Sequence, residues 1–147
     1  MPTQSSQSSE DSTTHSNLDT TSWGNPLSLE KTDSALRLLL QNPYGINASN
    51  NYCKLDYLAH GMATYQINIA CLPETNVDWK KPTVLKPCHA LLRKHFKHHR
   101  LVPSTSTASA EHSYLPGGTA CIVANEWTGR LAKSGPDPKG LGRWSYV

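Results

Sequence analysis

The stretch that decides the fold runs from Ala35 to Leu72 and reads ALRLLLQNPYGINASNNYCKLDYLAHGMATYQINIACL. Each end of this stretch, Ala35–Leu40 and Ile67–Leu72, is a short apolar run. The first run is followed by the turn residues Asn42-Pro43-Tyr44-Gly45, and the second by Pro73. Short apolar runs closed by such residues are typical of buried strands. The sequence therefore predicts two buried strands here.

The segment between the two runs has the spacing of an amphipathic helix. Its apolar residues recur at i, i+3, i+4 and i+7, which predicts a helix from Tyr52 to Tyr65. Asn50 or Asn51 is available as its N-cap. A strand, a helix and a strand with short connections form a βαβ unit, so the two strands are expected to be parallel, with their carboxyl ends at one edge of the sheet.

Further elements are expected beyond this unit. A second helix is predicted from Thr83 to His99, with Cys88, Leu92 and Phe96 on its buried face, and a loop from Ser104 to Ser113. Gly117-Gly118 then opens a strand through Ala120–Ala124, and the last apolar segment, Arg143–Val147, is expected to be another strand. The predicted fold class is therefore α/β, with one mixed β-sheet and two helices on one of its faces.

Composition places one domain in the 147-residue chain. Nearly half of residues 1–34 are Ser or Thr without hydrophobic periodicity, which predicts a disordered tail before a domain at 35–147. The net charge of +3 is too small for a dedicated DNA-binding protein. The four cysteines form no C-x-x-C pair, and no signal peptide or membrane span is expected. We therefore expect reduced thiols in an intracellular protein, which leaves a nuclear location open.

Two polar side chains follow the two predicted parallel strands: Asn42 after the first and Glu74 after the second. Ligands of open α/β sheets gather at the carboxyl ends of the strands. A carboxylate there is a suitable oxygen ligand for Mg²⁺, which keeps its other positions for water and phosphate. The alternative is that Glu74 only caps a helix or a loop.

Three blocks, Leu40–Ile46, Cys71–Asn76 and Gly117–Val123, resemble the first three conserved blocks of the endonuclease/exonuclease/phosphatase superfamily. In order and spacing they are similar to the endonucleases of non-LTR retrotransposons, which accompany a reverse transcriptase. The resemblance implies a DNase-I-like four-layer α/β sandwich, of which this chain supplies about one sheet. It also implies Mg²⁺-dependent hydrolysis of DNA, with Mn²⁺ as a substitute ion. Glu74 matches the family's metal-binding glutamate, and Asn42 matches the asparagine that steadies the metal and the phosphate.

Later blocks of that superfamily are missing from the sequence. The family draws its general base and further phosphate ligands from an Asp-x-Asn pair and a Ser-Asp-His ending, and neither occurs here. We therefore expect residues 35–147 to be a truncated domain without activity of its own. A non-catalytic remnant that binds nucleic acid weakly and a phosphatase-type member of the superfamily are the alternatives. The uncovered sheet face is expected to be apolar and to promote association.

Other polar residues allow further interpretations. Asn76, Arg93, Lys97 and Arg100 are the candidates for contacts with nucleic acid, although the basic stretch Arg93–Arg100 could equally be a solvated helix end. His95 and His99 have the i, i+4 spacing of a zinc-ligand pair, but no second pair accompanies them. The tryptophans Trp79, Trp127 and Trp144 are most simply explained by packing.

Overall fold

The structure, a computed structural model, describes residues 28–46, 48–105 and 115–147. Most of the predicted tail and most of the loop after Ser104 lie outside these residues. The described part of the tail, residues 28–34, contains no helix or strand. Within the described ranges, no helix has both the length and the apolar composition needed to cross a membrane.

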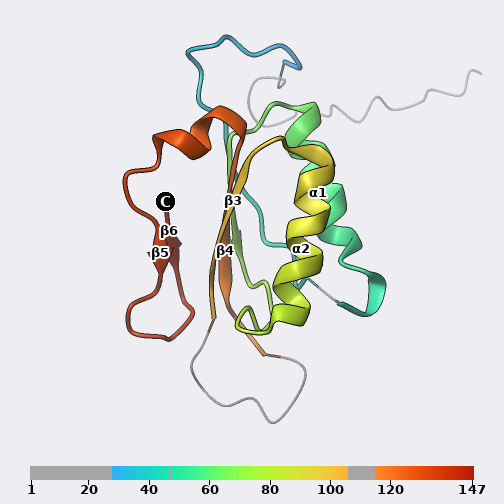
Figure 1. The fold of residues 1–147 in the computed structure, drawn as a ribbon, viewed down its shortest axis with the longest axis vertical. Helices are drawn as coiled ribbons and strands as arrows, with labels where there is room; N and C mark the ends of the chain where they lie inside the picture. The colour runs from blue at the N-terminus through green and yellow to red at the C-terminus, as the bar shows by residue number, and fades with distance from the viewer. Residues whose placement is uncertain (1–27, 47, 106–114) are drawn as a thin grey trace, which may run out of the picture.

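A four-stranded mixed sheet forms the centre of the fold (Figure 1). Across the sheet the strands are β1 (Leu38–Leu40), β2 (Ile69–Pro73), β4 (Thr119–Ala124) and β3 (His99–Ser104). β1 and β2 are parallel, as predicted, while β4 is antiparallel to both β2 and β3. Three strands therefore point the same way, and the carboxyl ends of β1 and β2 share one edge of the sheet.

Two helices cover one face of this sheet (Figure 1). They are α1 (Cys53–Thr64) and α2 (Pro82–His95), and short 3-10 helices lie at Ala48–Asn50 (η1) and Asn125–Arg130 (η2). The predicted α/β class with two helices on one face is confirmed. The predicted N-cap of α1 is wrong, because the cap position is Tyr52 in a left-handed conformation without a side-chain cap bond.

The hydrophobic core lies between the helices and the sheet. Ile122 and Leu72 from the central strands pack with Leu55 from α1 and Leu92 from α2, and all four side chains are fully buried. Alternation along each strand sends every second side chain to this face. Burial of a Leu or Ile side chain contributes about 1.5–3 kcal/mol, so this layer is the main source of stability.

The opposite face of the sheet is only partly covered. A small antiparallel pair, β5 (Gly135–Pro136) and β6 (Ser145–Tyr146), contacts β3 and β4 from this side (Figure 1). On this face nothing in the described ranges covers β1, and Leu38 and Leu40 are 67% and 78% exposed. The prediction that the first strand is buried is therefore wrong for these two leucines, because β1 is an edge strand with a single covered face.

The cysteines are all unpaired. Cys71 of β2 and Cys121 of β4 are cross-strand neighbours on the partly covered face, with their sulfur atoms 3.7 Å apart. Burial, together with the neighbouring Cys121 thiol, raises the pKa of Cys71 to about 11. A thiol with such a high pKa is a poor nucleophile, so Cys71 packs as a small apolar group.

The strand β3 was not predicted. The helix expected to reach His99 ends at His95, and Phe96 has extended backbone angles. The chain then enters β3, which pairs with β4 over its whole length, from His99 opposite Ala124 to Ser104 opposite Thr119. Pairing with β4 and burial of Leu101 and Val102 outweigh the local preference of this basic, proline-containing segment.

Candidate functional site

The structure brings Asn42 and Glu74 together at the shared carboxyl edge of β1 and β2. The Asn42 Nδ2 amide donates a hydrogen bond of 2.9 Å to Oε2 of Glu74. Asn42 follows β1 by two residues and Glu74 follows β2 by one, so the parallel pairing of the strands sets this meeting. Both residues are exposed, and the pair is open to a ligand from solvent.

The turn that carries Asn42 is fastened to the segment that carries Glu74. The backbone N–H groups of Gly45 and Ile46 donate to the carbonyl oxygens of Glu74 and Thr75, at 2.9 and 2.7 Å. Oδ1 of Asn42 accepts a hydrogen bond of 2.8 Å from the N–H of Tyr44. The Asn42 amide is thereby oriented with its Nδ2 toward Glu74.

The glycine pair Gly117-Gly118 completes the site from a third direction. The N–H of Thr75 donates to Gly118 O (3.1 Å), and the N–H of Asn76 donates to Gly117 O (2.8 Å). In return, the N–H of Gly117 donates to Oδ1 of Asn76 (2.8 Å). The three sequence blocks that resemble the nuclease superfamily are therefore neighbours in space. The Asn76 side-chain oxygen holds a loop, so its predicted role in nucleic-acid contact stays a prediction.

The backbone at this edge is strained. Tyr44, Glu74 and Asn76 have positive φ angles of 50°, 52° and 53°. Residues other than glycine adopt this left-handed conformation uncommonly, and it costs about 1–3 kcal/mol each. Such strain is retained where the surrounding structure enforces it, and it concentrates at functional sites. Here it directs the Glu74 side chain to the end of the sheet, beside Asn42.

Thr75 is a structural member of the site that the sequence did not single out. Its side chain is fully buried, and its Oγ1 accepts a hydrogen bond of 2.9 Å from Nε1 of Trp79. Trp79 is itself buried, which confirms its predicted packing role. This bond anchors the 74–76 turn to the core, and the preference of a buried indole N–H for an acceptor is the physical signal that could have indicated it.

The residues present supply a small donor set for a metal ion. One carboxylate oxygen of Glu74, Oε2, accepts the hydrogen bond from Asn42. Within the part of the chain that the structure describes, no side chain is seen to contact the other carboxylate oxygen. Among the described residues, no three His, Cys, Asp or Glu side chains form a group that could hold a metal. This set fits Mg²⁺ when water and phosphate fill most positions, because Mg²⁺ commonly uses one or two protein carboxylates. In the observed orientation Asn42 is a positioning residue, since its amide nitrogen faces Glu74.

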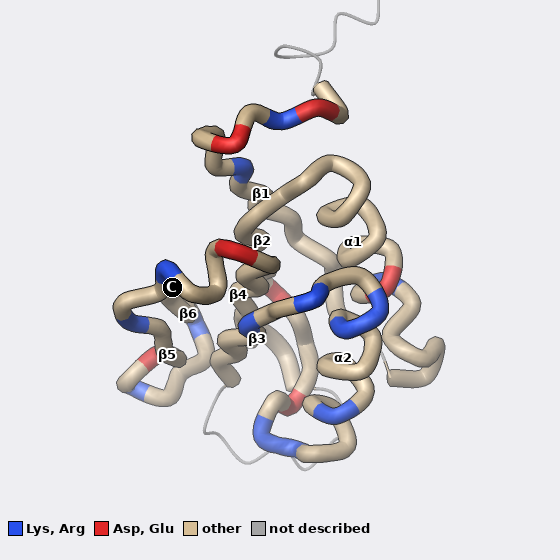
Figure 2. Tube along the Cα trace, turned by 45° about the horizontal axis from the view of Figure 1, so that its top comes forward, with Lys and Arg blue, Asp and Glu red and all other residues tan. Residues whose placement is uncertain are grey.

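The basic candidates lie at the other end of the sheet. Arg100 is aligned with Val123, which pairs with Ile69 at the start of β2, whereas Glu74 follows the end of β2. The five residues of β2 span about 16 Å. Arg93 lies in the last turn of α2 and Lys97 lies between α2 and β3. Figure 2 shows Lys and Arg along the segment that joins α2 to β3. The structure therefore does not bring these cations together with Asn42 and Glu74.

The two histidines considered for zinc have separate partners. Nε2 of His95 lies 2.9 Å from Oδ1 of Asp56, and Nε2 of His99 lies 2.9 Å from Nδ1 of His89. Burial, followed by the nearby charged groups, lowers the pKa of both His89 and His99. The hypothesis of a His95/His99 zinc pair is therefore wrong for this fold, because α2 ends between the two residues.

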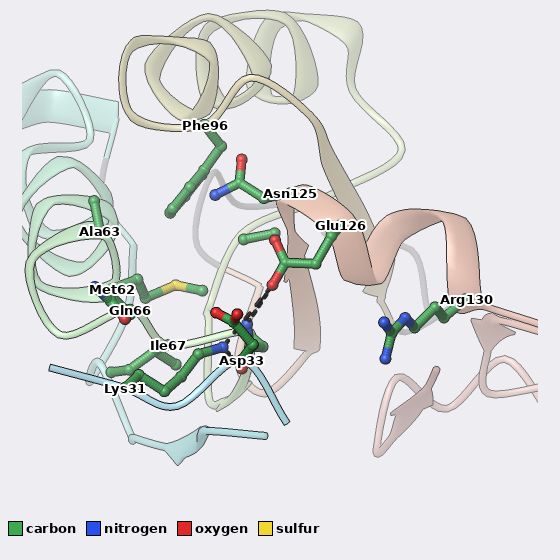
Figure 3. A pocket seen from close by; sticks show the side chains of 12 residues that line it. Lys31, Asp33, Met62, Ala63, Gln66, Ile67, Phe96, Asn125, Glu126 and Arg130 are labelled. Atoms are coloured by element: carbon green, nitrogen blue, oxygen red, sulfur yellow. Dashed lines mark hydrogen bonds and ion pairs between the residues drawn. The ribbon is translucent and has the colours of Figure 1, made fainter. Parts of the chain in front are cut away.

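Figure 3 shows a second part of the surface, a hollow of about 460 Å³. Its lining includes Asn68, just before β2, and Ala124, the last residue of β4, so it lies at the end of the sheet opposite Glu74. Buried Asn68 organises it: its Oδ1 accepts hydrogen bonds of 2.9 Å from Lys31 Nζ and from the Arg37 N–H. Its Nδ2 donates to Oε1 of Glu126 (3.3 Å), which also lies 3.9 Å from Lys31 Nζ. These polar groups hydrogen-bond with one another, and the bonds from Lys31 and Arg37 to Asn68 attach residues 31–37 to the sheet.

Comparison with solved structures shows a likeness in fold. The chain is similar in structure to an endonuclease/exonuclease/phosphatase family protein from Leptotrichia buccalis C-1013-b. The two share 21% sequence identity with a TM-score of 0.46, and the match covers 60% of this chain. The chain matches 38% of the length of that protein. No family model and no curated protein matches the sequence.

The two glycines of the third block provide a matched test of how tightly this site is packed. A Cβ on Gly118 would lie 3.0 Å from Thr75 Oγ1 and 3.3 Å from Ser104 O, whereas a Cβ on Gly117 would meet nothing within 4 Å. Both glycines have positive φ. Gly117→Ala is expected to cost about 1–2 kcal/mol from backbone strain. Gly118→Ala should cost about 2–3 kcal/mol, because steric overlap is added. Urea denaturation measures both, and equal costs would contradict the packing described here.

Proposed function

We propose that this chain carries the metal- and phosphate-binding part of a Mg²⁺-dependent DNA endonuclease of the endonuclease/exonuclease/phosphatase superfamily, of the retroelement type. The observation that carries the proposal is the 2.9 Å hydrogen bond between Asn42 and Glu74 at the carboxyl ends of parallel strands. Glu74 reaches this position through a left-handed backbone conformation. The same two residues are those that the motif resemblance assigns to the metal and the phosphate.

The chain's own residues would act by binding and orientation. The Glu74 carboxylate would hold Mg²⁺, or Mn²⁺, through the oxygen that Asn42 leaves free. Asn42 would fix the direction of that carboxylate. The bound ion would polarise a phosphoryl oxygen of the DNA. The hydrogen bonds from the 42–46 turn and from Gly117-Gly118 keep the turn rigid, which lowers the cost of organising the site around a phosphate.

A second function is favoured by a specific observation. Asn42 is the only side-chain partner of Glu74 that the described residues show, and the sequence lacks the Asp-x-Asn and Ser-Asp-His blocks. General-base catalysis contributes about 10²–10⁴-fold, so its loss leaves hydrolysis slow. The second candidate is therefore metal-dependent binding of nucleic acid without hydrolysis. In both functions Glu74 holds the ion.

Nicking of supercoiled plasmid by the full chain tests the proposal. The endonuclease candidate predicts weak nicking with Mg²⁺ or Mn²⁺, none with EDTA, and a loss of about 100-fold or more in Glu74→Gln. The second candidate predicts no nicking under any of these conditions. Binding of labelled DNA, with and without the ion, is measured in parallel and does not need turnover. Glu30→Gln is the matched control, because Glu30 is exposed and its backbone oxygen accepts from Arg37 at the other end of β1.

Three outcomes are distinguishable. Metal-dependent nicking that requires Glu74 supports the endonuclease. Metal-dependent binding that requires Glu74, without nicking, assigns the chain to the second candidate. Binding and nicking that are unchanged in Glu74→Gln would overturn both, because no other part of the proposal supplies a metal ligand.

A further inference from the structure

A second hollow, of about 500 Å³, begins directly beside Asn42. It lies between β1 and α1, and Asn42 itself contributes to its wall. The helix lines it with one stripe: Lys54, Tyr57, Leu58, Gly61 and Tyr65 recur at the spacing of a single helix face. Residues 54 to 65 cover about 16 Å along a helix axis, so the hollow is a groove that leads away from the candidate site.

The floor and the rim of this groove differ in chemistry. Leu39, Leu58 and Ile67 form an apolar floor, and Gln41 adds a polar group at the Asn42 end. Tyr57 stands at the rim with 77% of its surface exposed, and Tyr65 is also exposed. Exposed apolar patches rimmed by polar groups are a feature of binding surfaces.

The Asn42 end of the groove carries one cation, Lys54, near the Glu74 carboxylate that Asn42 holds. Lys54 Nζ donates hydrogen bonds of 3.0 Å to the carbonyl oxygens of Pro43 and Tyr44, and it lies 5.9 Å from the centre of the Tyr44 ring. An ammonium group has three protons, so one is left for a phosphate oxygen. Tyr44 is itself 82% exposed, which adds a third accessible aromatic ring beside the candidate site.

We infer that this groove binds the unpaired bases of a single DNA strand whose backbone enters at Asn42 and Glu74. Sites for single strands combine aromatic side chains, on which bases stack, with cations that follow the phosphates. The groove offers two exposed tyrosines for stacking and one cation, Lys54, for a phosphate, and it begins at the residue that positions Glu74. The inference rests on the proposed function, because it is the phosphate site that orients the strand. The preferred substrate is then single-stranded DNA or a duplex with an unpaired end.

Gly61 offers a direct way to obstruct the groove. It lies on the groove side of α1, and a Cβ built on it meets nothing within 4 Å. The position therefore has room for a Cβ, and the longer side chain of Gly61→Leu is expected to extend into the groove. The substitution should not weaken α1, because leucine is a better helix former than glycine. Gly129→Leu is the matched control: Gly129 also has open space, and it lies in η2, beyond the end of β4 that is remote from Glu74.

Fluorescence anisotropy measures the affinity of the full chain for an oligothymidine of about 12 nucleotides and for a blunt duplex of the same length. Ca²⁺ replaces Mg²⁺ in this experiment to limit turnover. Wild type is expected to bind the single strand about 10-fold more tightly. Gly61→Leu and Tyr57→Ala should each weaken binding of the single strand about 10-fold, which corresponds to the loss of about one stacked base. Their affinity for the duplex should stay within about 2-fold of the wild-type affinity. Gly129→Leu and Tyr57→Phe should behave as wild type.

Equal affinity for the two DNAs, no binding of either, or a preference that survives Gly61→Leu would overturn the inference. If an apolar peptide is the natural occupant, equal affinity for the two DNAs or no binding of either is the expected result. Failure of the proposed function has a different signature, because Glu74→Gln then leaves metal-dependent nicking and binding unchanged. A preference for single strands without nicking keeps the groove and removes only the hydrolysis.

Discussion

Trp79→Ala is expected to lower the free energy of unfolding by about 3–5 kcal/mol. Trp79 is buried in the core below the 74–76 turn, so the substitution leaves a large cavity. It also removes the indole N–H that donates a 2.9 Å hydrogen bond to Oγ1 of Thr75, and the Thr75 side chain is fully buried. Urea denaturation followed by circular dichroism measures the change.

Trp79→Phe separates the two parts of this effect. The phenyl ring retains most of the packing but has no N–H to donate to Thr75, so a smaller cost of about 1–3 kcal/mol is expected. The turn that carries Glu74 should loosen in both variants, with faster amide exchange of Asn76, whose N–H donates to Gly117 O. If Trp79→Phe is as damaging as Trp79→Ala, the hydrogen bond contributes more than the cavity.

Asn68→Ala is expected to cost about 3–4 kcal/mol. The side-chain amide of Asn68 accepts hydrogen bonds from Lys31 and from the Arg37 N–H, and it donates one to Glu126. The Lys31 side chain is only 8% exposed. Removal of the amide leaves a buried ammonium whose remaining partner is Glu126 at 3.9 Å. A buried charge that loses a partner is strongly destabilising. Thermal and urea denaturation give the cost.

A double-mutant cycle with Lys31→Met tests the reason for that cost. Methionine replaces the buried charge by an apolar chain of similar length, so Asn68→Ala should be less damaging in the Lys31→Met background. A coupling free energy of about 1 kcal/mol or more is expected for groups in direct contact. Additive costs would show that Lys31 does not depend on Asn68.

The parts of the fold that could be predicted are those with a local signal. The 3.6-residue period predicted both ends of α1 to within one residue of those observed. The apolar run before Pro73 indicated β2. The meeting of Asn42 with Glu74 followed from the parallel pairing of two strands, which the βαβ rule supplies. These predictions needed no knowledge of distant contacts.

The rest depended on contacts between distant segments. β3 exists because β4, about twenty residues later, supplies its hydrogen bonds, and its own basic residues and Pro103 indicate no strand. Because α2 ends at His95, the basic stretch is divided between a helix and a strand at the far end of the sheet. The role of Thr75 required its burial beside Trp79, which sequence spacing does not reveal.

The uncovered leucines of β1 also affect how readily molecules of this protein associate in solution. Leu38 and Leu40 stand on an edge strand, where two molecules can meet through apolar side chains and unpaired backbone groups. A net charge of +3 gives little mutual repulsion between molecules, and salt screens it further. We therefore expect this short strip of β1 to limit the concentration at which the protein remains monodisperse, and raising the ionic strength should lower that concentration.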